Sequence, residues 1–311
     1  MNRDTVLITT SSFGREDNTP LTMIAKCGFE PVLNPFGRKL TEEEVIQLFH
    51  KYKPIAMIAG VEPLTDRVLK NAEGLKVISR CGIGLDNVDI DAARKLGIVV
   101  TNTPDAPTQA VAELTVGLIL AVLRNVPHMD RALRDGKWER PMGTLLSEKT
   151  VGIIGCGRIG SAVARLLKGF NCNLIGFDPF LSSHPEIHLT TLEKLLTTAE
   201  IITIHVPYSN SVHYFINEDK LKLMRPTAIL VNTSRGGLVD ENALYRVLKD
   251  KRIAGACLDC YEQEPYSGPL RELSNVVLSA HVGSYAREAR IKMEIEAVDN
   301  LLNALLKGKD K

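Results

Sequence analysis

The segment VGIIGCGRIGSAVARLL, residues 151–167, constrains the fold of this chain more than any other stretch. A short apolar run leads into a turn with three glycines, and an amphipathic helical pattern follows at once. Strand, glycine turn and helix in this order predict the start of a βαβ unit with a parallel sheet. The segment begins near the middle of the 311 residues, so a separate region must fold from the residues before it.

The three glycines, Gly155, Gly157 and Gly160, fit the spacing G-x-G-x-x-G. They allow, in turn, a tight turn, a close approach of the backbone to a pyrophosphate, and close contact between helix and strand. Free N–H groups at the start of the helix attract the pyrophosphate. Asp178 ends the next predicted strand, where a carboxylate accepts hydrogen bonds from a ribose and repels a 2′-phosphate. The pattern therefore predicts a dinucleotide site that prefers NAD to NADP.

Short apolar runs alternate with helical patterns in two series along the chain. This alternation predicts an α/β fold with two doubly wound parallel sheets. The first series has no glycine fingerprint after its first strand, so we expect a flavodoxin-like substrate domain there. The first series contains TVLITTSS, EPVLN, IAMIAG, KVISRCG and IVVTNTP, and the second contains TVGIIG, CNLIGFD, IITIHVP, AILVNTS, AGACLDC and NVVLSAH.

The last helical pattern, residues 285–307, comes too late to belong to the second series. We expect it to pack back on the first domain, so that the second domain is an insertion. Residues 1–101 and 285–311 would then form the substrate domain, and residues 102–284 a Rossmann NAD-binding domain. The apolar residues that form a stripe along this helix are Ile291, Ile295, Val298, Leu302 and Leu305.

Composition excludes several classes of partner. The formal net charge is +1 and no block of lysine and arginine stands out, so we expect neither a nucleic acid nor a membrane surface as partner. The N-terminus shows no signal-peptide pattern, which favours a cytoplasmic protein. Residues 105–126 predict one long helix; its apolar part, VAELTVGLILAVL, contains Glu113 and is too short to span a bilayer.

The six cysteines are scattered and do not resemble a disulfide framework. Cys257 and Cys260 have the spacing C-x-x-C, but they lie on a predicted strand, where residues three apart point to opposite faces. We therefore expect core thiols here and predict no metal site.

Polar residues follow the predicted strands of the second series. Ligands of open α/β sheets bind beyond the carboxyl ends of the strands, so these residues should meet at the ligand edge. The residues at the strand exits are Asp178, His205, Thr233, Ser234, Arg235, Asp259 and His281.

Three of the polar residues near strand ends suggest specific chemistry. Arg235 offers a fork of donors for a carboxylate. Glu264 lies in the loop before the last strand and is placed to approach His281, which we expect to face the cleft between the domains. A carboxylate–imidazole pair suits general acid–base catalysis. His205 is the rival base, and its position fits the lining of a cofactor pocket equally well.

At these residues the chain resembles the D-isomer-specific 2-hydroxyacid dehydrogenases, along essentially its whole length. The resemblance lies in GCGRIG with Asp178, VNTSRGGLVDENAL, CLDCYEQEP and LSAHVGS. It implies that Arg235 holds the carboxylate of a 2-keto acid, that NADH delivers hydride, and that His281, assisted by Glu264, protonates the oxygen. It further implies an NAD site lined by Arg158, Ile159, Val206, Thr233, Ser234, Arg235, Asp259, His281, Gly283 and Ser284, and carboxylate binding by the turn Cys81, Gly82, Ile83 and Gly84.

Within the family, SRCGIGLDNVDIDAA and DGKWER resemble 3-phosphoglycerate dehydrogenases, which act in serine biosynthesis. Arg80 matches a basic residue that those enzymes direct toward the substrate phosphate. The sequence departs from them at Gly60, where some members carry a phosphate-binding arginine. Lys137 and Arg140 are further cations, which a dimer would bring to a neighbouring site or leave on the surface. The resemblance ends with the catalytic unit, so no serine-sensing domain is expected.

Three functions stay open at this point, and the sequence favours the first of them. The first is interconversion of D-3-phosphoglycerate and 3-phosphohydroxypyruvate, and the second is reduction of hydroxypyruvate, glyoxylate or other 2-keto acids. The third is an NAD-sensing binding protein of the corepressor type. The resemblance also implies a homodimer through the region 105–126, because that helix carries more apolar surface than one cofactor domain is expected to cover.

Overall fold

The computed structural model describes residues 3–307, which divide into two compact units. Unit 2 is residues 108–283, and unit 1 is the chain before and after it. The sequence placed the two crossings at 101/102 and 284/285, a few residues away. The chain leaves unit 1 later than predicted, because the last strand of unit 1 ends at Asn102 and Ala106 still packs in the core of unit 1. Ser284, predicted in the NAD-binding domain, belongs to unit 1.

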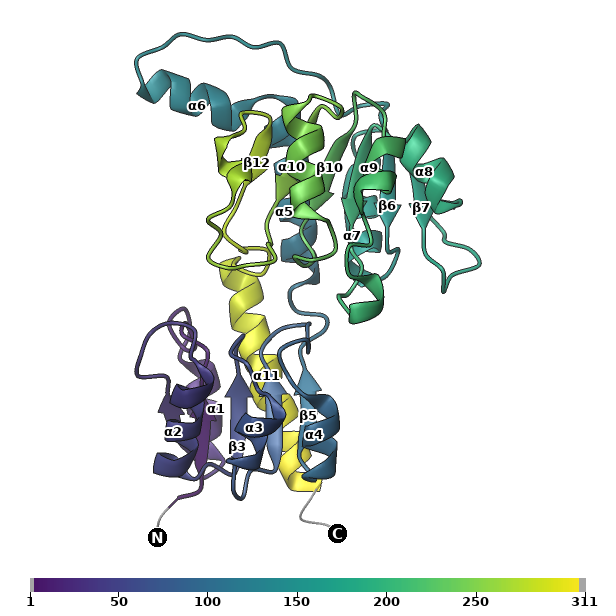
Figure 1. Cartoon of the computed structure of the whole chain (residues 1–311). Coiled ribbons are helices and arrows are strands. Elements are labelled where there is room, and N and C mark those ends of the chain that lie inside the picture. The colour runs from purple at the N-terminus through teal and green to yellow at the C-terminus, as the bar shows by residue number, and fades with distance from the viewer. Residues whose placement is uncertain (1–2, 308–311) are drawn as a thin grey trace. The chain divides into compact units, whose positions relative to one another are not determined.

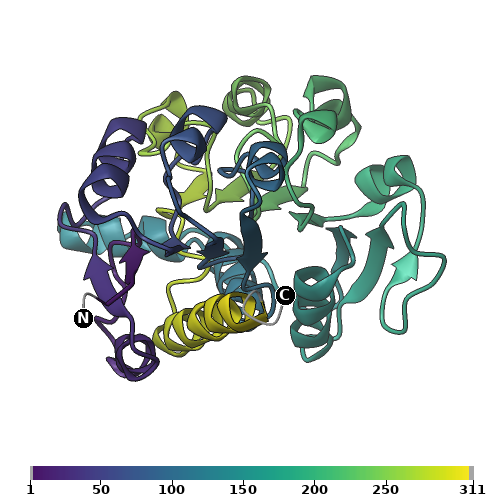
Figure 2. The same ribbon diagram turned by 90° about the horizontal axis from the view of Figure 1, so that it is seen from below.

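Unit 1 is built on a parallel sheet with strand order β2-β1-β3-β4-β5, the flavodoxin-like order. Helices α2, α3 and α4 cover one face, and α1 and α11 cover the other (Figure 2). The strands are β1 Thr5–Ile8, β2 Glu30–Leu33, β3 Ala56–Ala59, β4 Val77–Arg80 and β5 Val99–Asn102; the helices are α1 Thr19–Lys26, α2 Glu42–Tyr52, α3 Asp66–Lys70, α4 Ile90–Lys95 and α11 Arg287–Lys307.

Helix α11 packs on the sheet of unit 1, which makes unit 2 an insertion, as the sequence predicted. Of the predicted stripe, Val298 and Leu305 are buried, whereas Ile291, Ile295 and Leu302 are only partly buried; the fully buried Met293, Ala297 and Leu301 complete the inner face. Met293 and Ala297 pack in the apolar core between this helix and the strands. The Ser79 hydroxyl, on β4, also donates a hydrogen bond of 2.7 Å to the Ala297 carbonyl.

Unit 2 is built on a parallel sheet with the order β12-β11-β10-β9-β6-β7-β8, a Rossmann order extended by one strand (Figure 1). Two helices, α5 and α7, cover one face, and α8, α9 and α10 the other. The strands are β6 Thr150–Ile154, β7 Asn173–Phe177, β8 His188–Leu189, β9 Ile201–Ile204, β10 Ile229–Asn232, β11 Gly255–Leu258 and β12 Val276–Leu278; the helices are α5 Thr108–Leu123, α6 Val126–Arg134, α7 Arg158–Lys168, α8 Leu192–Thr198, α9 Glu218–Leu223 and α10 Glu241–Lys249, with short 3₁₀ turns at Asn210–Val212 and Pro269–Glu272.

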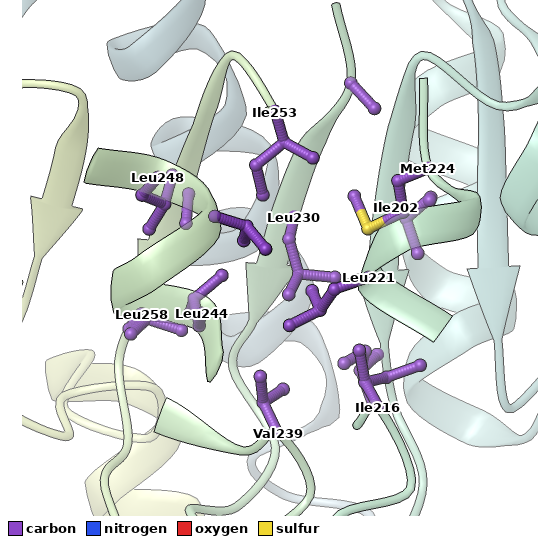
Figure 3. Packing of buried hydrophobic residues seen from close by; sticks show 14 of the residues in the cluster. Ile202, Ile216, Leu221, Met224, Leu230, Val239, Leu244, Leu248, Ile253 and Leu258 are labelled. Atoms are coloured by element: carbon purple, nitrogen blue, oxygen red, sulfur yellow. The ribbon is translucent and has the colours of Figure 1, made fainter. Parts of the chain in front are cut away.

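Apolar side chains fill the space between this sheet and its helices. Leu230 on β10 lies at the centre of the cluster in Figure 3, with Leu221 from α9 and Leu244 from α10 against it. Strands β9, β10 and β11 are buried on both faces, which explains why their sequences are continuous apolar runs. The packing holds the carboxyl ends of the strands at one rigid edge.

The predicted single helix over 105–126 is two helices, α5 and α6, bent by 63°. Asn125 between them adopts a left-handed backbone conformation with φ 53°, and Pro127 lies in the first turn of α6. Among the described residues no single helix is long and apolar enough to cross a membrane, although this bent pair passes on length and composition together. The apolar side chains of α5 are mostly buried inside unit 2, so the expectation of a large uncovered apolar face on this helix was wrong.

Both thiols of the C-x-x-C pair are buried, as predicted. The Cys257 thiol donates to the Leu118 carbonyl at 3.4 Å, and the Cys260 thiol donates to the Asn232 carbonyl at 3.7 Å. Burial raises the pKa of both thiols well above the usual value. Within residues 3–307, no cluster of three His, Cys, Asp or Glu side chains has the arrangement of a metal site.

Candidate functional site

The glycine turn after β6 lies where the strand order of unit 2 reverses, between β6 and β9. This switch point is the usual ligand position in open α/β sheets. A Cβ atom on Gly155, whose φ is +86°, would lie 2.7 Å from the His205 carbonyl oxygen. A Cβ atom on Gly160 would lie 2.1 Å from the Gly155 carbonyl oxygen, so helix and strand touch there.

Gly157 differs from the other two glycines because a Cβ atom there would meet open space. It precedes Arg158, the first residue of the 11-residue helix α7. Open space before exposed helix N–H groups suits the pyrophosphate of a dinucleotide. The turn therefore fits the cofactor that the sequence predicts.

The Asp178 carboxylate, directly after β7, points to the glycine turn. Its Oδ2 accepts a hydrogen bond of 3.0 Å from the Cys156 amide, and its Oδ1 accepts one of 3.0 Å from the Phe180 amide. These bonds hold the carboxylate at the strand exit where a ribose acceptor is expected. Each carboxylate oxygen has further lone pairs for a ligand.

His281 and Glu264 form a close pair. The His281 Nδ1 lies 3.0 and 2.9 Å from the two oxygens of Glu264. Because a carboxylate only accepts, Nδ1 carries the proton and donates it. Within residues 3–307 the other ring nitrogen, Nε2, makes no hydrogen bond. The pair therefore presents Nε2 for proton exchange with a ligand.

The Glu264 carboxyl stays ionised despite its partial burial. Burial raises its pKa, but the hydrogen bond and charge of His281, the Tyr261 amide and the charge of Arg235 outweigh burial and lower the pKa. Arg235 is thus close enough to act on Glu264. The structure brings together the three residues that the sequence singled out for chemistry.

The loop that carries His281 is held by Asp259, which is almost fully buried. Asp259 Oδ1 accepts from the Ser279 hydroxyl at 2.7 Å and the Val282 amide at 2.9 Å, and Oδ2 accepts from the Gly283 amide at 2.8 Å. His281 itself has a left-handed φ of 52°, an uncommon backbone conformation for a residue other than glycine. The predicted cofactor contact of Asp259 stays a prediction; what its oxygens hold is the His281 loop.

Arg235 lies in a tight turn after β10. The Asn232 side chain donates to the Arg235 carbonyl at 2.8 Å and accepts from the Ser234 amide at 3.1 Å. Sequence reasoning missed Asn232, although an asparagine at a strand exit is typical of such a turn. Gly236 follows, and a Cβ atom there would lie 2.0 Å from the Tyr261 carbonyl. Only glycine allows this approach, which brings the Arg235 turn against the Glu264 loop.

Three predicted cofactor-lining residues lie beside this turn. The Ser234 hydroxyl donates to the Val206 carbonyl at 2.5 Å. The Thr233 hydroxyl lies 2.8 Å from that of Thr115 on α5, a partner that only the folded chain reveals. These contacts order the exits of β9 and β10. The roles of Arg158, Ile159, Gly283 and Ser284 at the cofactor stay predictions.

His205, the rival base, is a poor proton donor. Its Nε2 lies 2.9 Å from the Thr203 hydroxyl, and its Nδ1 is buried without a partner among residues 3–307. Burial lowers its pKa to about 3, because a charged imidazole would lose its hydration. His205 is therefore neutral near pH 7.

In unit 1, the predicted substrate turn from Cys81 to Gly84 follows β4. The Gly82 amide is already used, since it donates to the Thr103 hydroxyl at 2.8 Å. Within the described residues the amides of Ile83 and Gly84 make no hydrogen bond, so they are the two donors that an anion would meet. Burial raises the pKa of the Cys81 thiol to about 12, which leaves this thiol uncharged.

Arg80 lies under the same turn and is 8% exposed. Its guanidinium donates to the Cys81 carbonyl, and a Cβ atom on Gly82 would clash with it. Its charge also acts on the nearby Glu62, whose pKa is nevertheless raised by burial. The guanidinium thus supports the turn from below.

Comparison with known proteins identifies the family. Residues 116–283 match the family model for the NAD-binding domain of D-isomer specific 2-hydroxyacid dehydrogenases. The chain belongs to the D-isomer-specific 2-hydroxyacid dehydrogenase family. Unit 2, residues 108–283, is accordingly the NAD-binding domain of this family member.

The most similar proteins carry two different names. A glyoxylate reductase of Thermofilum pendens is 43% identical over 262 residues, which cover 79% of this chain and 77% of that protein. A D-3-phosphoglycerate dehydrogenase of Synechocystis sp. is 36% identical over 274 residues, covering 86% of this chain and 49% of that protein. The chain spans about half the length of these D-3-phosphoglycerate dehydrogenases. Among solved structures, the TT0316 protein of Thermus thermophilus has a TM-score of 0.90 at 35% identity, with 97% of each chain covered.

Replacing Asp178 by alanine is expected to weaken the binding of NADH much more than the binding of NADPH. The carboxylate would bind the ribose hydroxyls of NADH and repel the 2′-phosphate of NADPH. Its loss therefore removes a favourable contact from NADH and a repulsion from NADPH. Fluorescence titration with each cofactor measures both dissociation constants. An equal loss for both would remove the ribose-acceptor role.

Proposed function

We propose that the protein interconverts a D-2-hydroxy acid and its 2-keto acid with NAD(H). The observation that carries the proposal is the Arg235–Glu264–His281 group at the carboxyl ends of the unit 2 strands. NAD(H), when bound, supplies or accepts the hydride. The protein's own residues must then bind a carboxylate, move a proton and hold both groups still.

We assign the proton to His281 and the carboxylate to Arg235. Glu264 holds the Nδ1 proton, so Nε2 can give a proton to the carbonyl oxygen during reduction and take it back during oxidation. The guanidinium of Arg235 offers paired N–H donors that match a carboxylate. Unit 1, taken by itself, offers an anion the amides of Ile83 and Gly84, with the Arg80 guanidinium beside their turn as positive charge.

For the substrate we propose a small unphosphorylated 2-keto acid such as hydroxypyruvate or glyoxylate. The supporting observations are that Arg80 is buried below its turn and that position 60 is glycine. A side chain at Gly60 would meet the Glu62 carboxylate, since a Cβ atom there lies 2.9 Å from Glu62 Oε2. This edge of unit 1 therefore favours an uncharged group over a phosphate.

The second candidate is 3-phosphohydroxypyruvate, with a role in serine biosynthesis. It is favoured by the resemblance of the Arg80 segment and by relatives named D-3-phosphoglycerate dehydrogenase. Measuring kcat/KM with NADH for 3-phosphohydroxypyruvate, hydroxypyruvate and glyoxylate decides between the two. A tenfold preference for the phosphorylated acid, about 1.4 kcal/mol of transition-state binding, would overturn our choice.

We also propose a homodimer, with the contact moved from α5 to the arm that follows it, residues 126–145. Its side chains Trp138, Met142 and Leu145 are 81%, 93% and 71% exposed. Exposed apolar side chains in one continuous segment are typical of an interface. The proposed contact between the two copies thus starts at residue 126, where the predicted contact region 105–126 ends.

Replacing Trp138, Met142 and Leu145 together by serine is expected to convert the dimer to a monomer. The reason is the loss of the apolar area that the contact would bury. Light scattering coupled to gel filtration measures the mass. Phe180→Ser is the matched control, because Phe180 is 92% exposed but lies outside the arm. A monomeric wild-type protein, or a triple variant that stays dimeric, would contradict this contact.

A further inference from the structure

Glu241, the first residue of α10, has a carboxylate that its own helix does not use. The helix is capped by Asp240, whose side chain accepts from the Ala243 amide at 2.9 Å. The Glu241 Oε1 instead accepts from the Glu262 amide at 2.7 Å, across 21 residues of chain. Glu241 thus binds the loop between β11 and β12 that carries Glu264.

Two carboxylates accept hydrogen bonds from consecutive backbone amides of that loop. The Tyr261 amide donates to Glu264 Oε1 at 3.1 Å, and the next amide, that of Glu262, donates to Glu241. Burial raises the pKa of Glu241, and the charges of Glu262 and Glu264 raise it further. Repulsion between like charges opposes this arrangement, so the hydrogen bonds to the two amides must offset it.

The backbone at this point has little freedom to move. Gly236 packs directly against the Glu262 backbone, since a Cβ atom on Gly236 would lie 2.4 Å from the Glu262 nitrogen. On the outside, the Tyr214 hydroxyl donates to Glu262 Oε2 at 3.1 Å. Glu241 is the group that binds the amide itself, one residue from the amide that orients Glu264.

We propose that Glu241 is a positioning residue for the Glu264–His281 pair. By holding the Glu262 amide, it fixes the turn from Tyr261 to Glu264 and so directs the Glu264 carboxylate to His281 Nδ1. This inference rests on the proposed function, because the pair matters for catalysis only if His281 exchanges a proton with the substrate. Glu241 itself has no contact with the reacting atoms in this account.

The test compares Glu241→Ala with Glu241→Gln in the full chain. Alanine removes the acceptor, and we expect kcat to fall about 10-fold to 100-fold while KM for NADH stays within twofold, because a hydrogen bond to a charged group is lost far from the cofactor turn. Glutamine keeps an acceptor oxygen, so we expect it to restore most of kcat. Glu193→Ala is the matched control, since it removes an exposed glutamate from the first turn of another helix of unit 2, α8, and should leave kcat unchanged.

Amide hydrogen exchange supplies a readout that does not depend on turnover. Peptides over residues 259–266 should exchange faster in Glu241→Ala than in the wild type, and Glu241→Gln should restore slow exchange. Unchanged kcat and exchange in Glu241→Ala would overturn the inference, as would an equal defect in Glu241→Gln. Loss of NADH binding together with kcat would show a general structural role and also overturn it. If the wild type reduces no 2-keto acid, the proposed function fails, and the exchange result still tests the contact.

Discussion

Replacing His281 by alanine is expected to lower kcat by about 10²–10⁴, the usual contribution of a general acid–base group. The Nε2 atom would be the proton donor, because Nδ1 is bound to Glu264. NADH binding should persist, because the glycine turn and Asp178 do not contact this side chain. Stopped-flow turnover and NADH fluorescence measure the two properties separately.

The control for this variant is His50→Ala, which removes an exposed histidine of unit 1 that pairs only with Asn71. It should leave kcat unchanged. Wild-type turnover in His281→Ala would contradict the assignment and would return the role to His205. That residue is a weak alternative, since burial keeps its imidazole neutral.

Replacing Arg235 by glutamine is expected to raise KM for the 2-keto acid and lower kcat/KM by roughly 30-fold to several thousand-fold. That range corresponds to about 2–5 kcal/mol for truncating one partner of a buried, hydrogen-bonded charge pair. Glutamine keeps part of the side-chain volume and loses the charge and the paired donors. Steady-state kinetics with hydroxypyruvate measure the effect.

Arg246→Gln is the matched control for Arg235, because Arg246 is a surface arginine in an ion pair of 2.7 Å with Glu218. Exposed ion pairs contribute little, so its kinetics should equal those of the wild type. A KM for hydroxypyruvate that stays the same in Arg235→Gln would contradict the carboxylate role.

Much of this molecule is visible in its sequence for identifiable reasons. Parallel strands buried on both faces must be apolar throughout, so β6 and β9 stand out as short runs. Chemistry in such a sheet is confined to the strand exits, which is why Asp178 and Arg235 could be selected before any geometry was known. The inserted domain followed from the same logic, because the helical pattern of α11 had no strand series left to join.

Features that depend on contacts between distant segments were out of reach. The bend at Asn125 needs a left-handed residue that the local apolar pattern does not indicate. Arg80 is a charged residue at the end of a strand, and only the fold shows that it is buried below Gly82. The hydrogen bonds of Asp259 to the loop after His281, and that of Glu241 to the Glu262 amide 21 residues later, join segments that the sequence pattern does not connect.

The most direct test of the central claim follows the hydride itself. NADH deuterated at C4 of the nicotinamide, on each face in turn, is incubated with the protein and hydroxypyruvate, and the product is examined for deuterium and configuration. We expect D-glycerate with one deuterium at C2 from one of the two deuterated cofactor isomers and unlabelled D-glycerate from the other. An L-configured product, or bound NADH without transfer to any 2-keto acid, would contradict it.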